Sequence, residues 1–344
     1  MTTALKNWRE SASLIIAAKN KLKSATNFNY KILTIKRSSK SGFMPNNYVF
    51  PGGNASSSDS DPKWLEIFQK AGYTKNELSG LMPKENVPSI LRDGTDGVPK
   101  FLSLRICAIR ETFEECGVLI GSRNKTTGNQ WAQHIDSEEI LEWQKVVHDD
   151  PNEFINLCLK FKVIPDVCAL KLWSNWITPP CLSSLFNAIF FIASFKDTPT
   201  TQAEEIEVAD IKWCDPQAYL DLNQKKEIML PPPQFYELSR IKILNDVDEL
   251  VRHSNERAPL GCEAFLPYRV KTKEGSFSCL PGDDFYPKNY DLENKNIDEI
   301  DHIPDSNVKH RVWHKSSHLN ILYTKNYKPK AGHLVPMYPN ESKL

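Results

Sequence analysis

The chain has 344 residues, 40% of them hydrophobic, so it is long enough to bury one large core or two smaller ones. Lys and Arg together number 43, and so do Asp and Glu, which leaves no net charge to hold DNA or an anionic membrane. No stretch approaches the roughly 20 apolar residues of a membrane span, and the eight cysteines form no C-x-x-C pair of the kind found in zinc ribbons. The composition therefore predicts a soluble intracellular protein with no DNA partner and no membrane span.

Two strands are predicted near the N-terminus, at residues 13–18 and 31–37, because both are short segments rich in aliphatic residues and a polar loop separates them. We expect them to be neighbours in one sheet. A proline and two glycines at 51–53 then mark a turn. Residues 60–100 combine a run with helical spacing at 64–68 with several glycines and prolines. We therefore expect an insertion there that contains one helix and a long connector.

A firm amphipathic helix is predicted after the insertion. Leu102, Ile106, Ile109 and Phe113 follow at steps of four, three and four and form one apolar stripe, which we expect to face the core. Gly117 marks the end of this helix. Later segments predict more strands of the same sheet and a short helix, whereas the last hundred residues contain few long periodic segments. The strands are 172–177, 187–195 and 207–213, and the helix is 234–244.

Three carboxylates gather on the amphipathic helix. At 100° per residue, Glu111, Glu114 and Glu115 share one face, roughly opposite the apolar stripe, and Arg110 lies beside Glu114. Like charges this close repel, so the clustering does not serve stability alone, whereas divalent cations would reverse the sign of the interaction. The competing interpretation is a solvent-exposed charged face.

The surrounding motif favours the first interpretation. Residues 110–118 read Arg-Glu-Thr-Phe-Glu-Glu-Cys-Gly-Val and resemble the R-E-U-x-E-E-x-G-U half of the Nudix box, in which U is usually bulky and apolar, so that Thr112 is a departure. Gly53 and Asp59 resemble the other half, with Asp in place of the usual Glu. Residues 60–109 stand between the halves where the motif has about seven residues, so about 43 are inserted. Because the entropy of loop closure grows slowly with length, the two halves can still meet.

Several other segments are similar to the animal peroxisomal acyl-coenzyme A diphosphatases of the Nudix family. They cover most of the chain, which makes this resemblance more specific than the Nudix box alone. One departure is the run Cys-Leu-Ser-Ser-Leu at 181–185, where the resemblance would place a basic residue before Phe186. The similar segments are 8–10, 36–45, 48–53, 173–176, 232–236 and 280–283.

The resemblance implies an α/β Nudix fold, in which a mixed β-sheet lies between helices, with a long insertion inside the Nudix box and a C-terminal extension. The corresponding division is a Nudix hydrolase domain at 1–245, with the insertion at about 60–100, and an extension at 246–341 that packs on it. The implied activity is metal-dependent hydrolysis of the diphosphate bond of coenzyme A and acyl-coenzyme A. Its products would be adenosine 3′,5′-bisphosphate and 4′-phosphopantetheine or the acyl form of the latter.

The resemblance also implies the residues of the active site. Glu111, Glu114 and Glu115 are the expected ligands of Mg²⁺ or Mn²⁺, ions that would neutralise the diphosphate and lower the pKa of an attacking water. Glu111 and Glu114 form the expected catalytic group together with Arg110, which orients a carboxylate rather than touching the substrate. The general base stays open between Glu111 and a carboxylate of the acidic run 204–207, for which a solvated loop is the competing interpretation.

Arg37, Gly52 and Gly53 are the expected substrate-binding residues. Arg37 and Lys36 end a strand just before the glycine turn and could pair with a substrate phosphate. A solvent-facing strand end is an equally good interpretation of these two cations.

Two other functions stay open. A Nudix hydrolase could act on another nucleoside diphosphate derivative, such as NADH, ADP-ribose or a capped RNA end, although the missing C-x-x-C pairs argue against the dinucleotide type with a zinc ribbon. A Nudix-fold binding module without catalysis is the second, and the intact glutamates argue against it.

His310, His314 and His318 follow at steps of four, as metal ligands could. We expect ordinary surface histidines instead, because no acidic or Cys partner stands at ligand spacing.

The sequence ends in Ser342-Lys343-Leu344, the tripeptide that peroxisomal import receptors recognise. We therefore expect the peroxisome as the location, and an import receptor as a partner besides the small-molecule substrate. The preceding segment, 329–341, contains three prolines and is expected to stay extended and accessible.

Overall fold

The sheet at the centre of the molecule is built around its first strand. In the computed structural model, which describes residues 5, 7–92, 97–126, 130–315 and 320–337, β1 (Arg9–Lys19) pairs in parallel with β9 (Phe186–Phe195) along almost its whole length. On its other side β1 pairs antiparallel with β2 (Tyr30–Arg37). The sheet has eight strands and is mixed, as the resemblance implied. Its order is β10 (Val208–Cys214), β2, β1, β9, β8 (Lys171–Ile177) and β11 (Ala264–Phe265), with β3 (Tyr48–Val49) paired to β2 and β4 (Gly52–Asn54) paired to β1.

Both faces of this sheet are buried, so its central strands contain continuous apolar runs instead of a strict alternation with polar residues. In β1, Leu14, Ile16 and Ala18 belong to one core cluster, whereas Ile15 and Ala17 belong to another. Successive side chains of a strand point to opposite faces, which accounts for this division. The two N-terminal strands are confirmed as neighbours, and the three later strands are confirmed as members of the same sheet.

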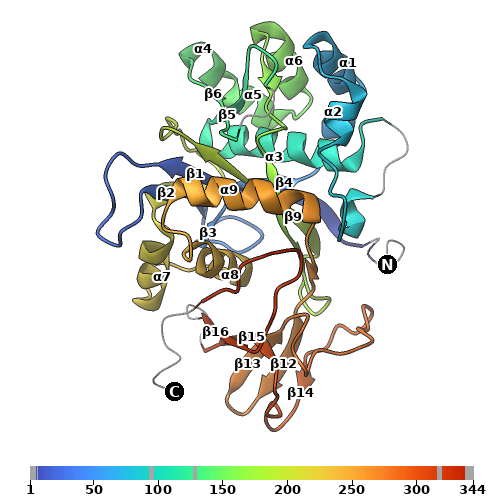
Figure 1. Cartoon of the computed structure of the whole chain (residues 1–344), viewed down its shortest axis with the longest axis vertical. Helices are drawn as coiled ribbons and strands as arrows, with labels where there is room; N and C mark the ends of the chain where they lie inside the picture. Colours follow the sequence, from blue (N-terminus) through green and yellow to red (C-terminus); the bar gives the residue numbers. More distant parts are fainter. Residues whose placement is uncertain (1–4, 6, 93–96, 127–129, 316–319, 338–344) are drawn as a thin grey trace.

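Helices cover each face of the sheet (Figure 1). α3 (Lys100–Cys116) packs against β1, β4 and β9 on one face, where the predicted apolar stripe is fully buried, and it ends at Gly117 as predicted. The other face is covered by three helices, which share a core cluster with the odd-numbered residues of β1. These helices are α7 (Pro216–Gln224), α8 (Pro232–Ile241) and α9 (Val247–Arg257), the last continued by a short 3₁₀ turn, η4 (Ala258–Leu260). The α/β architecture expected from the sequence is therefore confirmed.

The insertion contains more regular structure than the sequence indicated. Besides the predicted helix, α1 (Lys63–Lys70), it forms a second one, α2 (Lys75–Ser79), so the expectation of a single helix was wrong. α2 has only five residues, too few for a periodic pattern, and it begins with a capping box between Thr74 and Glu77. Short 3₁₀ turns stand at η2 (Ser57–Ser60) and η3 (Ser89–Leu91). α1 buries Trp64 and Phe68 in the same core as α3, so the insertion is part of the core.

Beyond α3 the chain forms a smaller layer that packs on the insertion. β5 (Leu119–Ser122) pairs with β6 (His134–Ile135) and β7 (Ile164–Pro165), and three helices follow or flank these strands. The rings of Trp64 and Phe154 lie 5.6 Å apart, which joins α1 of the insertion to this layer. The helices are α4 (Glu138–Leu141), α5 (Trp143–Asp149) and α6 (Glu153–Phe161).

The last part of the chain forms a second sheet at one end of the molecule (Figure 1). Its strands have two to six residues, which explains the lack of long periodic segments in the sequence. Their order is β14 (Asp298–Glu299), β12 (Tyr268–Thr272), β13 (Gly275–Cys279), β15 (Lys309–His314) and β16 (Asn320–Lys325). Among the helices of the described residues, none is long and apolar enough to cross a membrane.

One expectation about this sheet was wrong. His310 is not a surface histidine, because its side chain is completely buried. Its two ring nitrogens lie 2.6 Å from the hydroxyl of Tyr236 and 2.8 Å from the carbonyl oxygen of Pro281, and these hydrogen bonds compensate for the loss of water. His314 is also largely enclosed, whereas His318 lies outside the described residues.

Candidate active site

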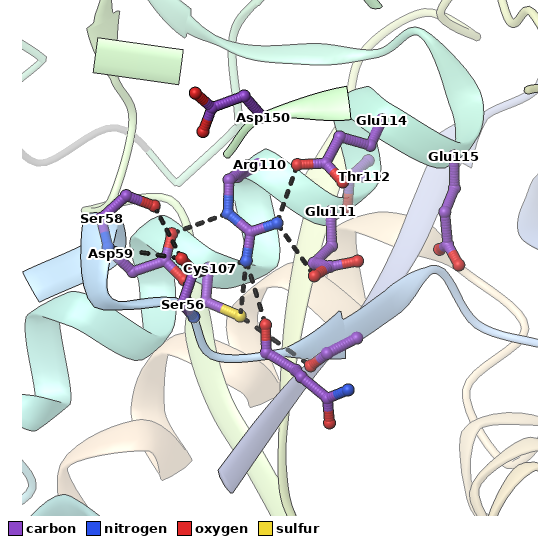
Figure 2. A network of polar contacts seen from close by, with 12 residues as sticks. Ser56, Ser58, Asp59, Cys107, Arg110, Glu111, Thr112, Glu114, Glu115 and Asp150 are labelled. Carbon is purple, nitrogen blue, oxygen red and sulfur yellow. Dashed lines mark hydrogen bonds and ion pairs between the residues drawn. The ribbon is translucent and has the colours of Figure 1, made fainter. Parts of the chain in front are cut away.

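Arg110 is at the centre of the candidate site, and its guanidinium is almost completely enclosed, with 2% of the side chain exposed. Nε and Nη2 donate to the two carboxylate oxygens of Asp59 at 2.8 and 2.9 Å, and Nη1 donates to Glu111 at 2.9 Å and to Glu114 at 2.8 Å (Figure 2). The second N–H of Nη2 donates to the carbonyl oxygen of Asn54 at 3.0 Å. A guanidinium has five N–H donors, and all five are therefore occupied. Arg110 has no donor left for a substrate and acts by holding carboxylates in place.

The insertion does not separate the two halves of the motif. Asp59 is buried in η2, where its carboxylate accepts a hydrogen bond of 2.8 Å from the backbone N–H of Ser56. The indole N–H of Trp64 donates to the carbonyl oxygen of Ser58 at 2.8 Å and so attaches the start of α1 to this turn. Asp59 reaches Arg110 because the inserted residues begin directly after a fixed turn and fold into the core beyond it.

The carboxylates of Glu111 and Glu115 lie against the backbone of the glycine turn in β4. A Cβ atom on Gly53 would lie only 2.4 Å from Glu111 Oε2, so glycine leaves the room that this carboxylate occupies. Gly52 has φ of 146°, and its N–H donates to Glu115 Oε2 at 2.7 Å. In Figure 2, the Glu115 side chain accordingly points away from Arg110. The structure thus brings together the glycine turn and all three glutamates that the sequence singled out.

Burial raises the pKa of all three glutamates. It raises the pKa of Glu111 to about 7 against the opposing effect of Arg110, and the charge of Glu114 adds to the rise. Burial likewise raises the pKa of Glu114 to about 7, again opposed by Arg110. The pKa of Glu115 rises well above 4.5, first through burial and then through the charge of Glu111. The charge of Arg110 does not balance these glutamates together with Asp59, so their ionised forms leave an excess of negative charge that a bound cation would relieve.

The glutamates are the residues of this site that could hold a divalent cation. Among the described residues, no three His, Cys, Asp or Glu side chains already stand together as a ligand set. Glu111 and Glu114 are turned towards Arg110, whereas Glu115 is bonded to the backbone of Gly52. Small rotations of these side chains would be needed to direct their oxygens at a shared ion, and carboxylate oxygens are the donors that hard divalent cations prefer.

Three glutamates precede β10, and only one of them acts on the cluster. Glu204 accepts two backbone N–H bonds of its own loop, at 2.8 and 2.6 Å, so it folds that loop. Glu205 is exposed. The charge of Glu207 raises the pKa of Glu114 and of Glu115, which places it within electrostatic range of both. Glu207 is therefore the member of this run that could accept a proton beside the cluster.

A cavity of about 250 Å³ opens beside the glycine turn, and Arg37, Gly52 and Gly53 line it. Lys36 does not line it, because adjacent side chains of a strand point to opposite faces. Nε of Arg37 donates to Ser41 Oγ at 2.9 Å, and the charge of Arg37 lowers the pKa of Glu115. Of the predicted substrate-binding residues, all three thus lie at the cavity, and Arg37 acts on the carboxylate cluster as well.

Part of the cavity wall comes from residues that the sequence did not point to. Pro267, Arg269, Ser278 and His314 belong to the C-terminal sheet or the loop before it. The only signal for them was the similar segment at 280–283, which indicated that the extension follows the family pattern without indicating a side chain. The predicted targeting tripeptide, 342–344, lies outside the described residues.

Comparisons with known proteins agree with this geometry. The family model described as the NUDT19 Nudix domain matches residues 8–241. The acyl-coenzyme A diphosphatase NUDT19 of Xenopus laevis is 33% identical, over 98% of this chain and 97% of that protein. The protein of the same name from Homo sapiens is 31% identical, over 96% of this chain and 94% of that protein. The putative nudix hydrolase 7 of Caenorhabditis elegans is 26% identical, over 81% of this chain and 75% of that protein.

A solved structure supports the fold. The crystal structure of a NUDIX hydrolase from Alicyclobacillus acidocaldarius matches with a TM-score of 0.52, over 71% of this chain and 96% of that one. At 17% sequence identity this similarity shows the fold alone. The family model covers more than half of the chain, and the relatives named above match nearly all of it. The chain therefore belongs to the NUDT19 group of the Nudix hydrolase family.

Proposed function

We propose that this chain hydrolyses the diphosphate bond of coenzyme A and of acyl-coenzyme A, releasing adenosine 3′,5′-bisphosphate and 4′-phosphopantetheine or its acyl form. The observation that carries the proposal is the buried cluster of Glu111, Glu114 and Glu115, held by Arg110 and by a glycine turn that lines a cavity. The names of the frog and human relatives, which match over nearly the full length, supply the substrate class.

We further propose that Mg²⁺ or Mn²⁺ binds at Glu111, Glu114 and Glu115. The donor set fits such an ion, because burial disfavours the ionised form of all three carboxylates and a bound divalent cation would stabilise it. Bound divalent ions would neutralise the diphosphate oxygens and lower the pKa of an attacking water.

The residues of the chain contribute positioning and proton transfer. Arg110 keeps Glu111 and Glu114 side by side, and the N–H of Gly52 fixes Glu115. These contacts hold the three carboxylates close together, so that only small side-chain rotations would be needed to direct them at a shared ion. Glu111 and Glu207 are the two candidates for the group that accepts a proton from the attacking water, since both belong to or act on the cluster.

A substrate panel tests the proposed function. The purified chain is given Mg²⁺ and, in separate reactions, coenzyme A, a short-chain and a long-chain acyl-coenzyme A, NADH and ADP-ribose, and the products are identified by mass. We expect kcat/KM to be highest for the coenzyme A compounds, with adenosine 3′,5′-bisphosphate as one product. A clear preference for NADH or ADP-ribose would leave only the general Nudix activity, and no turnover of any compound would point to a binding module.

We also propose that the chain acts in peroxisomes, where acyl chains are handled as coenzyme A thioesters. Support comes from the tripeptide Ser342-Lys343-Leu344, which import receptors read at a free carboxylate. Removing the tripeptide from a chain with an N-terminal fluorescent tag is expected to shift the fluorescence from peroxisomes to the cytosol and to leave the activity unchanged. Retention of the truncated chain in peroxisomes would contradict the proposal.

A further inference from the structure

The C-terminal sheet contributes a permanent positive charge to the wall of the active-site cavity. Arg269 of β12 lines the cavity, and its Nη2 donates to Ser276 Oγ at 3.1 Å. Its Nε is shielded from solvent and has no hydrogen-bond partner among the residues that the structure describes. Within that part of the chain, no carboxylate lies within ion-pair distance of this guanidinium. A partly buried cation without a counterion costs free energy, and a bound anion would reduce this cost.

The polar neighbours of Arg269 in this wall are neutral. His314 Nδ1 lies 2.8 Å from Asn320 Oδ1, and its Nε2 lies 2.8 Å from Ser278 Oγ. Asn320 donates its own amide N–H to the carbonyl oxygen of Leu230, so its Oδ1 accepts from His314 and Ser278 donates to the ring. Burial lowers the pKa of His314 to about 4, so the ring is uncharged at neutral pH. Arg269 therefore provides the charge of this wall.

A second guanidinium, that of Arg37, belongs to the part of the cavity beside the carboxylate cluster. It lines the cavity together with Gly52 and Gly53, and its charge acts on Glu115. Much of the remaining wall is apolar and includes five aromatic residues. Among them, the rings of Phe43 and Phe186 have centroids 4.9 Å apart. The cavity thus offers one cation near the reacting carboxylates, an apolar surface, and another cation on the C-terminal sheet.

We propose that Arg269 binds the 3′-phosphate of the adenosine part of coenzyme A, with the purine against the apolar wall. This assignment rests on the proposed function. The diphosphate of the substrate belongs at the carboxylate cluster, and the 3′-phosphate is the remaining anion that every coenzyme A ester carries. A guanidinium is suited to it because it can donate two hydrogen bonds to one phosphate. The C-terminal sheet then determines substrate choice, because Arg269 binds a 3′-phosphate that NADH and ADP-ribose lack.

Paired substrates test the assignment. The kcat/KM values for coenzyme A and dephospho-coenzyme A are measured for the wild-type chain, for Arg269→Gln and for Arg269→Lys. The wild-type enzyme is expected to prefer coenzyme A by about 10- to 100-fold, the size of effect typical of a charge-assisted hydrogen bond to phosphate. Arg269→Gln is expected to abolish most of this preference. Arg269→Lys keeps the positive charge but lacks the paired N–H donors of the guanidinium, so it is expected to keep part of the preference.

The matched control is Arg252→Gln, since Arg252 is exposed on α9 and does not line the cavity. This variant should keep the wild-type preference. Direct binding supplies a readout apart from turnover: calorimetry with adenosine 3′,5′-bisphosphate and with AMP should show that Arg269→Gln weakens binding of the bisphosphate about 10-fold more than binding of AMP. Unchanged far-UV circular dichroism and thermal midpoint establish that the variant is folded.

Several outcomes would overturn the assignment. A wild-type enzyme that cuts coenzyme A and dephospho-coenzyme A equally well would contradict it while leaving the proposed function intact, whereas failure to cut coenzyme A at all would contradict both. If Arg269→Gln lowered kcat/KM equally for coenzyme A and dephospho-coenzyme A, Arg269 would have only a structural role. Comparison of succinyl- with butyryl-coenzyme A covers the other anionic source: a loss confined to the succinyl ester would assign Arg269 to an acyl carboxylate instead.

Discussion

The absence of a side chain at Gly53 leaves open the space that the Glu111 carboxylate occupies. A Cβ on Gly53 would lie 2.4 Å from Glu111 Oε2 and 2.6 Å from Glu111 Cδ, so the carboxylate rests where a side chain would otherwise begin. The glycine of the motif therefore has a steric role at the first carboxylate, in addition to its role in the turn.

Replacement of Gly53 by alanine is expected to displace the Glu111 carboxylate and to lower turnover by about 10- to 100-fold, because misplacement of a reacting group by about 1 Å has effects of this size. The added methyl meets only the end of a flexible side chain, so the thermal midpoint should change little. Gly42→Ala is the matched control, since nothing lies within 4 Å of a Cβ there. Wild-type kinetics in Gly53→Ala would show that Glu111 has no fixed position to lose.

Substitution of Glu114 or Glu115 by glutamine keeps the shape of the side chain and removes one negative charge. Turnover is expected to fall at least about 100-fold for each variant, with little loss of stability, because the proposed cation loses a charged ligand. Steady-state kinetics over a range of Mg²⁺ concentrations measures this effect. Glu66→Gln on the exposed side of α1 is the control. Near-normal turnover of both site variants would disprove the assignment of these glutamates.

Removal of the guanidinium in Arg110→Met should destabilise the fold. Asp59, Glu111 and Glu114 would lose their shared partner in a buried site, and breaking a buried ion pair from one side typically costs about 3–5 kcal/mol. Urea denaturation in the presence of EDTA measures the free energy of unfolding. Arg252→Met, at an exposed position, should change it by no more than about 0.5 kcal/mol. Equal stabilities of the two variants would mean that the network around Arg110 contributes no net stabilisation.

The raised pKa values of Glu111 and Glu114 predict a dependence of stability on pH in the metal-free protein. Both carboxyl groups have a pKa of about 7 in the fold and an ordinary value of 4.5, so the folded state binds their protons more tightly than the unfolded state does. Their contribution to stability is therefore fully present below pH 4.5 and is lost as the pH rises through about 7.

The pH effect is measured as a difference between two proteins. In EDTA, the wild-type chain should lose stability between pH 5 and pH 8 relative to the double variant Glu111→Gln, Glu114→Gln, and Mg²⁺ should restore more stability at pH 8 than at pH 5. Parallel stability curves for the two proteins would show that these carboxyl groups do not titrate differently on folding.

The sequence predicted the parts of this protein that depend on local periodicity. Two strands of the central sheet were predictable because their short, mostly apolar runs, 14–18 and 32–35, are visible without knowledge of their neighbours. The helix that carries the glutamates was predictable from its stripe, which shares the core with β1. The glutamates themselves were predictable because the motif specifies residue types at fixed spacing on that one helix.

The parts that the sequence did not predict depend on contacts between distant segments. α2 is too short to show a period. The burial of His310 on β15 depends on Tyr236, a partner on helix α8, and no spacing in the sequence joins them. Arg269 stands in a five-residue strand whose place at the cavity follows from the packing of the second sheet on the first, so it resembled any other surface arginine.

The parallel pairing of β1 with β9 also has a consequence for synthesis of the chain. Arg9 pairs with Phe186, so one long edge of the first strand can pair only after more than half of the chain has been made. At roughly 5–20 residues per second, this delay is about 10 to 35 s. During that time the apolar run 14–18 has a free edge, which favours association with other chains. We therefore expect this protein to depend on chaperones that bind nascent chains more than a protein with only local strand pairs would.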